Sequence, residues 1–167
     1  MRTSLSRRNC LAHMSAAVAL AALQRSAFGK DAPAKPKEKV KIGQIGIGHN
    51  HGAAKMEAFR KLKDDFEVVG VVEPDPKWRR KREKEKAYKE LTWLTEEELF
   101  AVKGLKAVAV ETDVPDLTAT ALRCVKAGFH VHVDKPGDES YTSFSTMLDE
   151  AGKRGLAVQM AYMFRGN

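Results

Sequence analysis

The sequence predicts an α/β fold in which a doubly wound parallel sheet is the middle of three layers. Short runs rich in β-branched residues alternate with stretches of helical periodicity from residue 40 to residue 161. The helical stretches are about ten to fifteen residues long, which is typical of right-handed crossovers between parallel strands. At 167 residues with 43% hydrophobic residues, the chain has room for one such domain with a sizeable core.

The first predicted strand, residues 40–47, is too short and too β-branched for a helix and ends in a glycine turn. Apolar residues then recur at helical spacing. Gly46 permits a sharp turn, Gly48 lets the backbone approach a diphosphate, and the free N–H groups of the helix N-terminus favour an anion. We therefore predict that a dinucleotide diphosphate is bound by Gly46, Ile47, Gly48, His49 and Asn50. The strict pattern has a third glycine at position 51, where this chain has His51.

The second predicted strand, residues 66–72, is followed by Glu73, which stands where an acid takes both ribose hydroxyls of an adenosine. Pro74 and Pro76 predict a turn, and residues 77–90 a highly charged helix. Arg79 or Arg80 in that helix could reach the 2′-phosphate of NADP. We favour a solvated helix face instead, because Glu73 would repel that phosphate.

The remaining elements continue the alternation. We expect a short edge strand at 91–94, a helix at 95–101 opened by a capping box, a strand at 105–111, a helix at 116–127, a strand at 129–134, a helix at 140–154 and a strand at 156–161.

Ligands of open parallel sheets bind outside the carboxyl ends of the strands, where strand order reverses. Thr112 follows one predicted strand, and Asp134, Lys135 and Pro136 end another, so these residues are candidates for the reactive end of the cofactor. Lys135 is a cation that could hydrogen-bond a substrate hydroxyl or the nicotinamide ribose, with Pro136 fixing the turn. From position alone, a solvated and inert lysine remains the alternative.

Segments at 46–49, 71–76, 127–136 and 159–167 together resemble the Gfo/Idh/MocA oxidoreductase family, named after glucose-fructose oxidoreductase and inositol dehydrogenase. The most specific is Asp134-Lys135-Pro136, which is similar to the family's Glu-Lys-Pro motif. The resemblance implies a Rossmann-type fold, hydride transfer from a sugar or polyol to NAD or NADP, a lysine at 135 that contacts substrate and nicotinamide, and a proline that is often cis. Residues 112–117 lack the histidine of the family's corresponding loop, so the nicotinamide-side contacts carry over only to Thr112.

In that family, the Asp and His that transfer the proton lie in a C-terminal α/β substrate domain. The resemblance therefore implies that this chain, which ends at Asn167, is a Rossmann domain at 40–161 with the C-terminal substrate domain absent, and that 162–167 begin a truncated second domain. We expect such a domain to bind NAD(P) without turnover on its own and to form oligomers only with the missing domain. A stand-alone nucleotide sensor or partner subunit is the alternative.

Residues 1–29 read as an export signal, with a basic start, a short apolar stretch and small residues before position 30. The segment at 6–11 resembles a twin-arginine signal, which implies a periplasmic protein without stable membrane association after cleavage. A basic N-terminal helix is the alternative. Residues 30–39, with two prolines and alternating charges, read as a linker.

The net charge of +7 does not predict a nucleic-acid partner, because Arg2, Arg7, Arg8 and Arg25 all lie in the predicted signal. The rest of the chain has 25 basic and 22 acidic residues, or +3. Binding through the basic 77–90 helix stays the one nucleic-acid alternative.

Cys10 also lies in the predicted signal, which leaves Cys124 as a packing residue and predicts no internal disulfide. Of the five histidines, His49 and His51 lie in the glycine turn, and His130 and His132 share one face of a strand. No third ligand stands at a recognisable spacing, so we predict no metal site.

Overall fold

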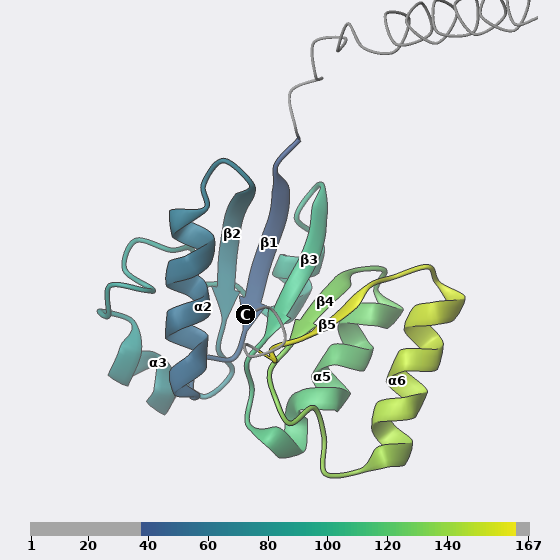
Figure 1. The fold of residues 1–167 in the computed structure, drawn as a ribbon. Coiled ribbons are helices and arrows are strands. Elements are labelled where there is room, and N and C mark those ends of the chain that lie inside the picture. Colours follow the sequence, from purple (N-terminus) through teal and green to yellow (C-terminus); the bar gives the residue numbers. More distant parts are fainter. Residues whose placement is uncertain (1–37, 163–167) are drawn as a thin grey trace, which may run out of the picture. The chain divides into compact units, whose positions relative to one another are not determined.

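The structure is a computed structural model that describes residues 38–162. Within this range, five parallel strands form one sheet in the order β2-β1-β3-β4-β5, as Figure 1 shows. The strands are β1 (Val40–Ile45), β2 (Phe66–Val72), β3 (Leu105–Val110), β4 (His130–Val133) and β5 (Val158–Met160). The predicted class, a doubly wound parallel sheet, is confirmed.

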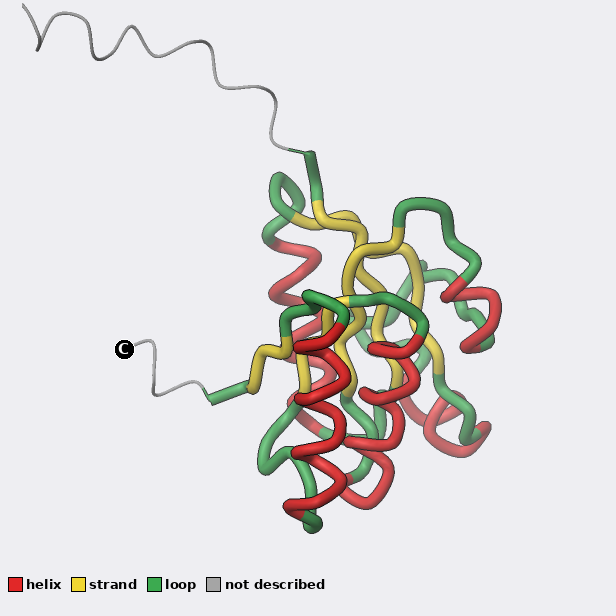
Figure 2. The backbone as a smooth tube through the Cα atoms, turned by 90° about the vertical axis from the view of Figure 1, so that its right-hand side faces the viewer, coloured by secondary structure: helices red, strands yellow, loops and turns green. Residues whose placement is uncertain are grey.

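Helices connect the strands and pack on both faces of the sheet. They are α2 (Asn50–Lys61), α3 (Pro76–Arg82), α4 (Glu96–Phe100), α5 (Val114–Lys126) and α6 (Tyr141–Lys153). One buried cluster packs α4, α5 and α6 against the sheet, and a second packs α2 and the segment after α3. Figure 2 shows the strands running between the helices. The predicted three-layer arrangement follows from these two clusters.

Strand order reverses at β1, which lies between β2 on one side and β3 on the other. The chain leaves β1 toward β2 through α2, and it later returns to the opposite side of β1 to enter β3. In doubly wound sheets this reversal opens a crevice at the carboxyl ends of the strands. The glycine turn after β1 therefore lies at the ligand-binding edge.

Several predicted boundaries are confirmed closely. Strand β2 has the predicted bounds, and Ser140 caps α6. Helix α4 begins with the predicted capping box, in which the Thr95 hydroxyl accepts from the Glu98 amide at 3.1 Å and the Glu98 carboxylate accepts from the Thr95 amide at 2.8 Å. Helix α5 begins two residues earlier than predicted, since Pro115 fits the first helical turn.

Two predictions on the β2 side need correction. The edge strand expected at 91–94 is reduced to an isolated parallel bridge between Val71 and Trp93. The helix expected at 77–90 ends at Arg82, and the chain then runs through turns. Those turns bury Ala87 and Tyr88 against the α2 face of the sheet. Burial of these two residues outweighs the helix propensity of the charged sequence.

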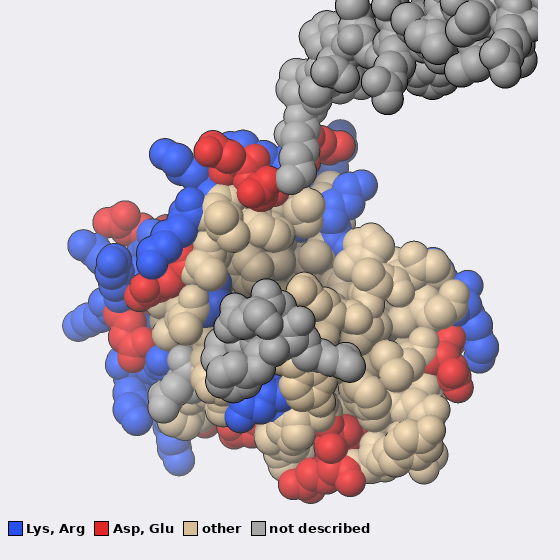
Figure 3. Space-filling model, viewed as in Figure 1, with Lys and Arg blue, Asp and Glu red and all other residues tan. Residues whose placement is uncertain are grey.

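Cys124 is buried in α5, as the packing interpretation requires. Basic and acidic side chains intermingle on the surface around α3, where Figure 3 shows blue and red atoms side by side. In the described range, no helix has the length and apolar character needed to cross a bilayer. The predicted signal, most of the linker and residues 163–167 lie outside the described residues.

Candidate dinucleotide site

The turn after β1 depends on Gly46. Its φ is +91°, and a Cβ at this position would lie 2.6 Å from the backbone of Glu111 and Thr112. Glycine is therefore the residue that fits both the backbone angle and the space. The predicted role of Gly46 in a sharp turn agrees with this geometry.

A side chain of the protein also lies close to Gly48. A Cβ at Gly48 would lie 2.9 Å from the indole nitrogen of Trp78, so an α3 side chain closely approaches this glycine. A larger residue at position 48 would therefore collide with Trp78, whether or not a ligand is bound. The side of Gly48 that faces Trp78 is occupied by protein.

Glu73 lies directly beside the glycine turn. One carboxylate oxygen accepts from the Ile47 amide at 2.8 Å, and the other accepts from the Asp75 amide at 2.9 Å. A carboxylate has about four acceptor positions, so two remain for ribose hydroxyls. The glycine turn and the acid after the second strand are therefore adjacent, which dinucleotide binding requires.

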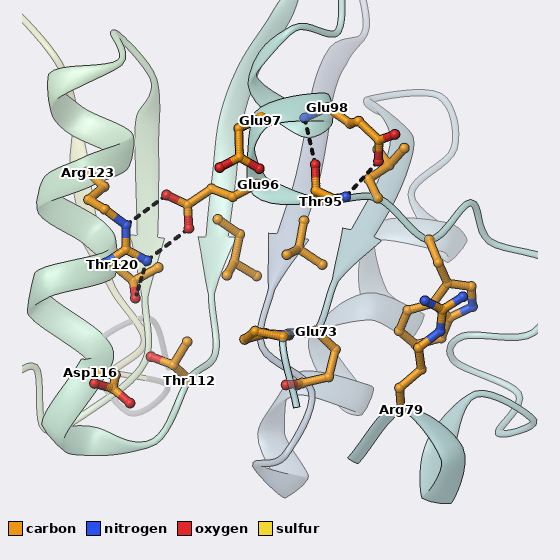
Figure 4. Close-up of a pocket in the computed structure, with 15 residues that line it drawn as sticks. Glu73, Arg79, Thr95, Glu96, Glu97, Glu98, Thr112, Asp116, Thr120 and Arg123 are labelled. Carbon is orange, nitrogen blue, oxygen red and sulfur yellow. Dashed lines mark hydrogen bonds and ion pairs between the residues drawn. The ribbon is translucent and has the colours of Figure 1, made fainter. Parts of the chain in front are cut away.

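Glu73 opens onto a cavity of about 670 Å³ between the loops that follow β2 and β3 (Figure 4). Thr112, another predicted contact, also lines this cavity. The lining carries five acidic and two basic side chains, which are Glu73, Glu96, Glu97, Glu98, Asp116, Arg79 and Arg123. This volume lies where a doubly wound fold holds an adenosine.

Both arginines of the cavity are already engaged. Arg123 forms a bidentate ion pair with Glu96 at 2.7 and 2.8 Å. The guanidinium of Arg79 lies 4.9 Å from the centre of the Trp93 ring, a cation–π arrangement. The acidic side chains therefore dominate the charge that a ligand meets here.

Arg82 holds the glycine turn in place through hydrogen bonds to its carbonyl oxygens, a role that the sequence did not reveal. Its guanidinium is buried and donates to the carbonyl oxygens of Ile47 and His49. Glu85 accepts two further hydrogen bonds at 3.0 Å, which raise the pKa of Arg82. Nothing distinguishes Arg82 in the sequence, because it is one of several basic residues in a row.

A second charged group lies under the first turns of α2. The Lys55 ammonium donates to Glu111 at 2.6 Å and to Asp134 at 2.9 Å. Burial raises the pKa of Glu111 to about 7, although Lys55 opposes the shift. Burial also acts to raise the pKa of Asp134, but hydrogen bonds from Lys55, His51 and the backbone outweigh it and leave that pKa lowered. Lys55 and Glu111 were not predicted, since each follows an ordinary helix or strand pattern.

Asp134 also meets both histidines of the glycine turn. The Nδ1 atoms of His49 and His51 each lie 3.1 Å from the same Asp134 oxygen. The sequence predicts no third ligand near this histidine pair. The structure supplies Asp134, which directly follows β4 and lies more than eighty residues along the chain.

The other predicted residues lie at the same edge. Lys135 is exposed and lines an apolar cavity of about 1030 Å³ between α2 and β5, together with His51 and Tyr162. The Lys135–Pro136 peptide is cis, as the resemblance implied. Asn50 is the first residue of α2. All the predicted residues thus gather at the carboxyl edge of the sheet.

Solved structures share this fold at low sequence identity. WlbA dehydrogenase from Bordetella pertussis, in complex with NADH and UDP-GlcNAcA, is 19% identical with a TM-score of 0.67 over 78% of this chain and 39% of that one. UDP-N-acetylglucosamine 3-dehydrogenase GnnA from Acidithiobacillus ferrooxidans is 20% identical with a TM-score of 0.64 over 77% and 40%. This chain thus spans about two fifths of the length of these structures.

A comparison with curated protein sequences finds no match. The model of the oxidoreductase family with an NAD-binding Rossmann fold, in contrast, matches residues 40–162, which is most of the chain. These residues hold the glycine turn, Glu73 and the cis Lys135–Pro136 peptide. The chain belongs to the Gfo/Idh/MocA family of oxidoreductases and contains its NAD-binding Rossmann domain.

Proposed function

We propose that the chain binds NAD(H) at the carboxyl edge of its sheet, with the diphosphate on the turn at 46–50 and the adenosine in the cavity beside Glu73. The observation that carries the proposal is the 2.8 Å hydrogen bond between Glu73 and the Ile47 amide. Because of this bond, the proposed acceptor of the ribose hydroxyls, Glu73, lies next to the backbone amides proposed to bind the diphosphate of the same nucleotide. A bound nicotinamide would supply hydride chemistry, and the residues named here would only hold and orient it.

NAD(H) is the preferred form in this proposal. A 2′-phosphate would carry up to two negative charges into a cavity with five acidic side chains and two engaged arginines. A difference of about 1.4 kcal/mol corresponds to tenfold in affinity. We expect NADH to bind at least tenfold more tightly than NADPH in parallel fluorescence titrations of the purified chain. Equal affinities would contradict the assignment of Glu73 to the ribose.

Substitution of Glu73 tests the site directly. Glu73→Ala should weaken NADH binding by tenfold or more, because a hydrogen bond to a charged group contributes about 1.5–3 kcal/mol. Glu73→Gln keeps an acceptor for the Ile47 amide and separates ribose binding from support of the turn. Glu139→Ala, at an exposed acid before α6, is the matched control. NADH affinity that is unchanged in folded Glu73→Ala would overturn the proposal.

We further propose that the whole protein oxidises a CH–OH group of a sugar or polyol. The hydride would pass to the oxidised nicotinamide and the hydroxyl proton to a base on the C-terminal substrate domain that the family resemblance implies, while the exposed Lys135 ammonium would donate a hydrogen bond to the substrate oxygen. One structural relative was solved in complex with UDP-GlcNAcA, and another is named as a UDP-N-acetylglucosamine 3-dehydrogenase. UDP-N-acetylglucosamine should therefore be tested as a substrate beside free sugars and polyols. Lys135→Ala should leave NADH affinity unchanged and reduce turnover in any form of the enzyme that is active.

For this chain alone, we propose binding without turnover, since Lys135 is the one catalytic candidate among its described residues. Reduction of NAD by the purified chain with any of these substrates would overturn that statement. We also propose export to the periplasm through the segment at 1–29. The test is cell fractionation followed by N-terminal sequencing, where recovery of the protein only in the cytoplasmic fraction with Met1 intact would contradict export.

A further inference from the structure

We propose that His49, His51 and Asp134 form a binding site for a divalent transition metal ion such as Zn²⁺. Each residue offers one ligand atom, and these atoms all lie within 4.8 Å of one another. Two imidazoles and one carboxylate are a ligand set that proteins use for zinc and for non-haem iron. The inference does not depend on the bound nucleotide.

The distances suit one shared ion. Both histidine Nδ1 atoms lie 3.1 Å from one Asp134 oxygen. Metal–ligand bonds of about 2.0–2.2 Å put neighbouring ligand atoms roughly 3.0–3.5 Å apart. The pairs around Asp134 therefore already have the spacing of a coordination shell.

The hydrogen bonding of His49 supports a cation at this point. His49 is the N-cap of α2, and its Nδ1 accepts from the His51 amide at 3.4 Å. A nitrogen that accepts there has no proton to donate to Asp134, so the 3.1 Å approach brings two acceptors together. An ion between them turns this repulsion into attraction.

The site is partly preorganised and its charge is compatible with a cation. The Asp134 side chain is only 5% exposed, and its other oxygen is held by Lys55 at 2.9 Å. The Lys55 ammonium opposes a cation, but it is shared between Asp134 and Glu111, which lies 2.6 Å from it. The other Asp134 oxygen lies 3.1 Å from the Nδ1 atoms of both imidazoles. The imidazole nitrogens favour a transition ion over Mg²⁺ or Ca²⁺, which take oxygen ligands.

The test is a titration of the chelator-treated, nucleotide-free chain, purified without a histidine tag, with Zn²⁺ by calorimetry and with Co²⁺ by visible absorption. We expect one ion per chain, Co²⁺ absorption bands typical of nitrogen and oxygen ligands, and no response to Mg²⁺. His49→Ala and His51→Ala should each weaken Zn²⁺ binding at least tenfold. His130→Ala is the matched control, because this exposed imidazole lies at the opposite end of β4 from Asp134.

Asp134→Asn completes the set, with circular dichroism to establish that it folds. If it does not fold, the two histidine variants decide, since their side chains are 37% and 42% exposed. Zn²⁺ affinity that is equal in the wild type, His49→Ala and His51→Ala would overturn the proposal. So would a folded wild-type chain that gives no Co²⁺ spectrum. Because no nucleotide is present, either result leaves NADH binding open to its own test.

Discussion

Arg82 offers the sharpest test of how the dinucleotide turn is held in place. Arg82→Met keeps much of the side-chain volume but removes the donors to the Ile47 and His49 carbonyl oxygens and the pair with Glu85. Each hydrogen bond from a charged group contributes about 1.5–3 kcal/mol. The two carbonyl contacts together predict a loss of about 3 kcal/mol in the free energy of unfolding.

Thermal unfolding followed by circular dichroism measures this loss. For a domain of this size, 1 kcal/mol lowers the melting temperature by roughly 4 °C, so we expect a decrease of about 12 °C. Arg80→Met is the matched control, because Arg80 is exposed on the same short helix and should change the melting temperature little. If Arg82→Met and Arg80→Met have the same melting temperature, the turn does not depend on Arg82. NADH affinity should fall in Arg82→Met alone, since the same carbonyls belong to the turn that we propose binds the diphosphate.

Three further predictions follow from buried groups and glycines. Burial raises the pKa of Glu111 from its ordinary value of 4.5 to about 7, so the folded state keeps a proton that the unfolded state loses. The free energy of unfolding should therefore fall between these two pH values, by an amount on the order of 3 kcal/mol, and Glu111→Gln should flatten that fall in urea titrations at several pH values. Burial raises the pKa of Cys124 to about 12, so in a Cys10→Ser background its thiol should react with Ellman's reagent only after denaturant is added; fast reaction in buffer would show that α5 opens. Gly46→Ala should destabilise the domain by more than 1 kcal/mol through its positive φ and backbone clash, while Gly152→Ala, in open space on α6, should stabilise it by about 0.5–1 kcal/mol.

Much of the fold could be predicted because the sequence signals were local. The β-branched run of β2 has the predicted bounds, and the capping box at Thr95 opens α4 as expected. Turn chemistry and side-chain periodicity act within a few residues, so one sequence suffices to detect them. The same holds for Glu73, whose position after β2 predicted its place beside the glycine turn.

The parts that could not be predicted depend on contacts between distant segments. The helix at 77–90 ended early because Tyr88 is buried against the sheet, which no local pattern indicates. Arg82 reaches carbonyl oxygens about thirty-five residues before it, and Lys55 bridges two acids that follow different strands. Asp134 joins the histidine pair across more than eighty residues. Such partners become visible only when the sheet order is known.

The hydrogen bond from the Ile47 amide to Glu73 also fixes the distance between the proposed binding sites for the ribose and the diphosphate of one nucleotide. Ile45 and Val72 are register partners in adjacent strands. The pairing of β1 with β2 therefore sets the distance between the glycine turn and Glu73. A nucleotide that binds at this edge as proposed would find the spacing already set and would lose little affinity to ordering of the protein. A slip in the alignment of β1 and β2 would therefore disturb recognition of sugar and diphosphate at once, even with every contacting residue unchanged.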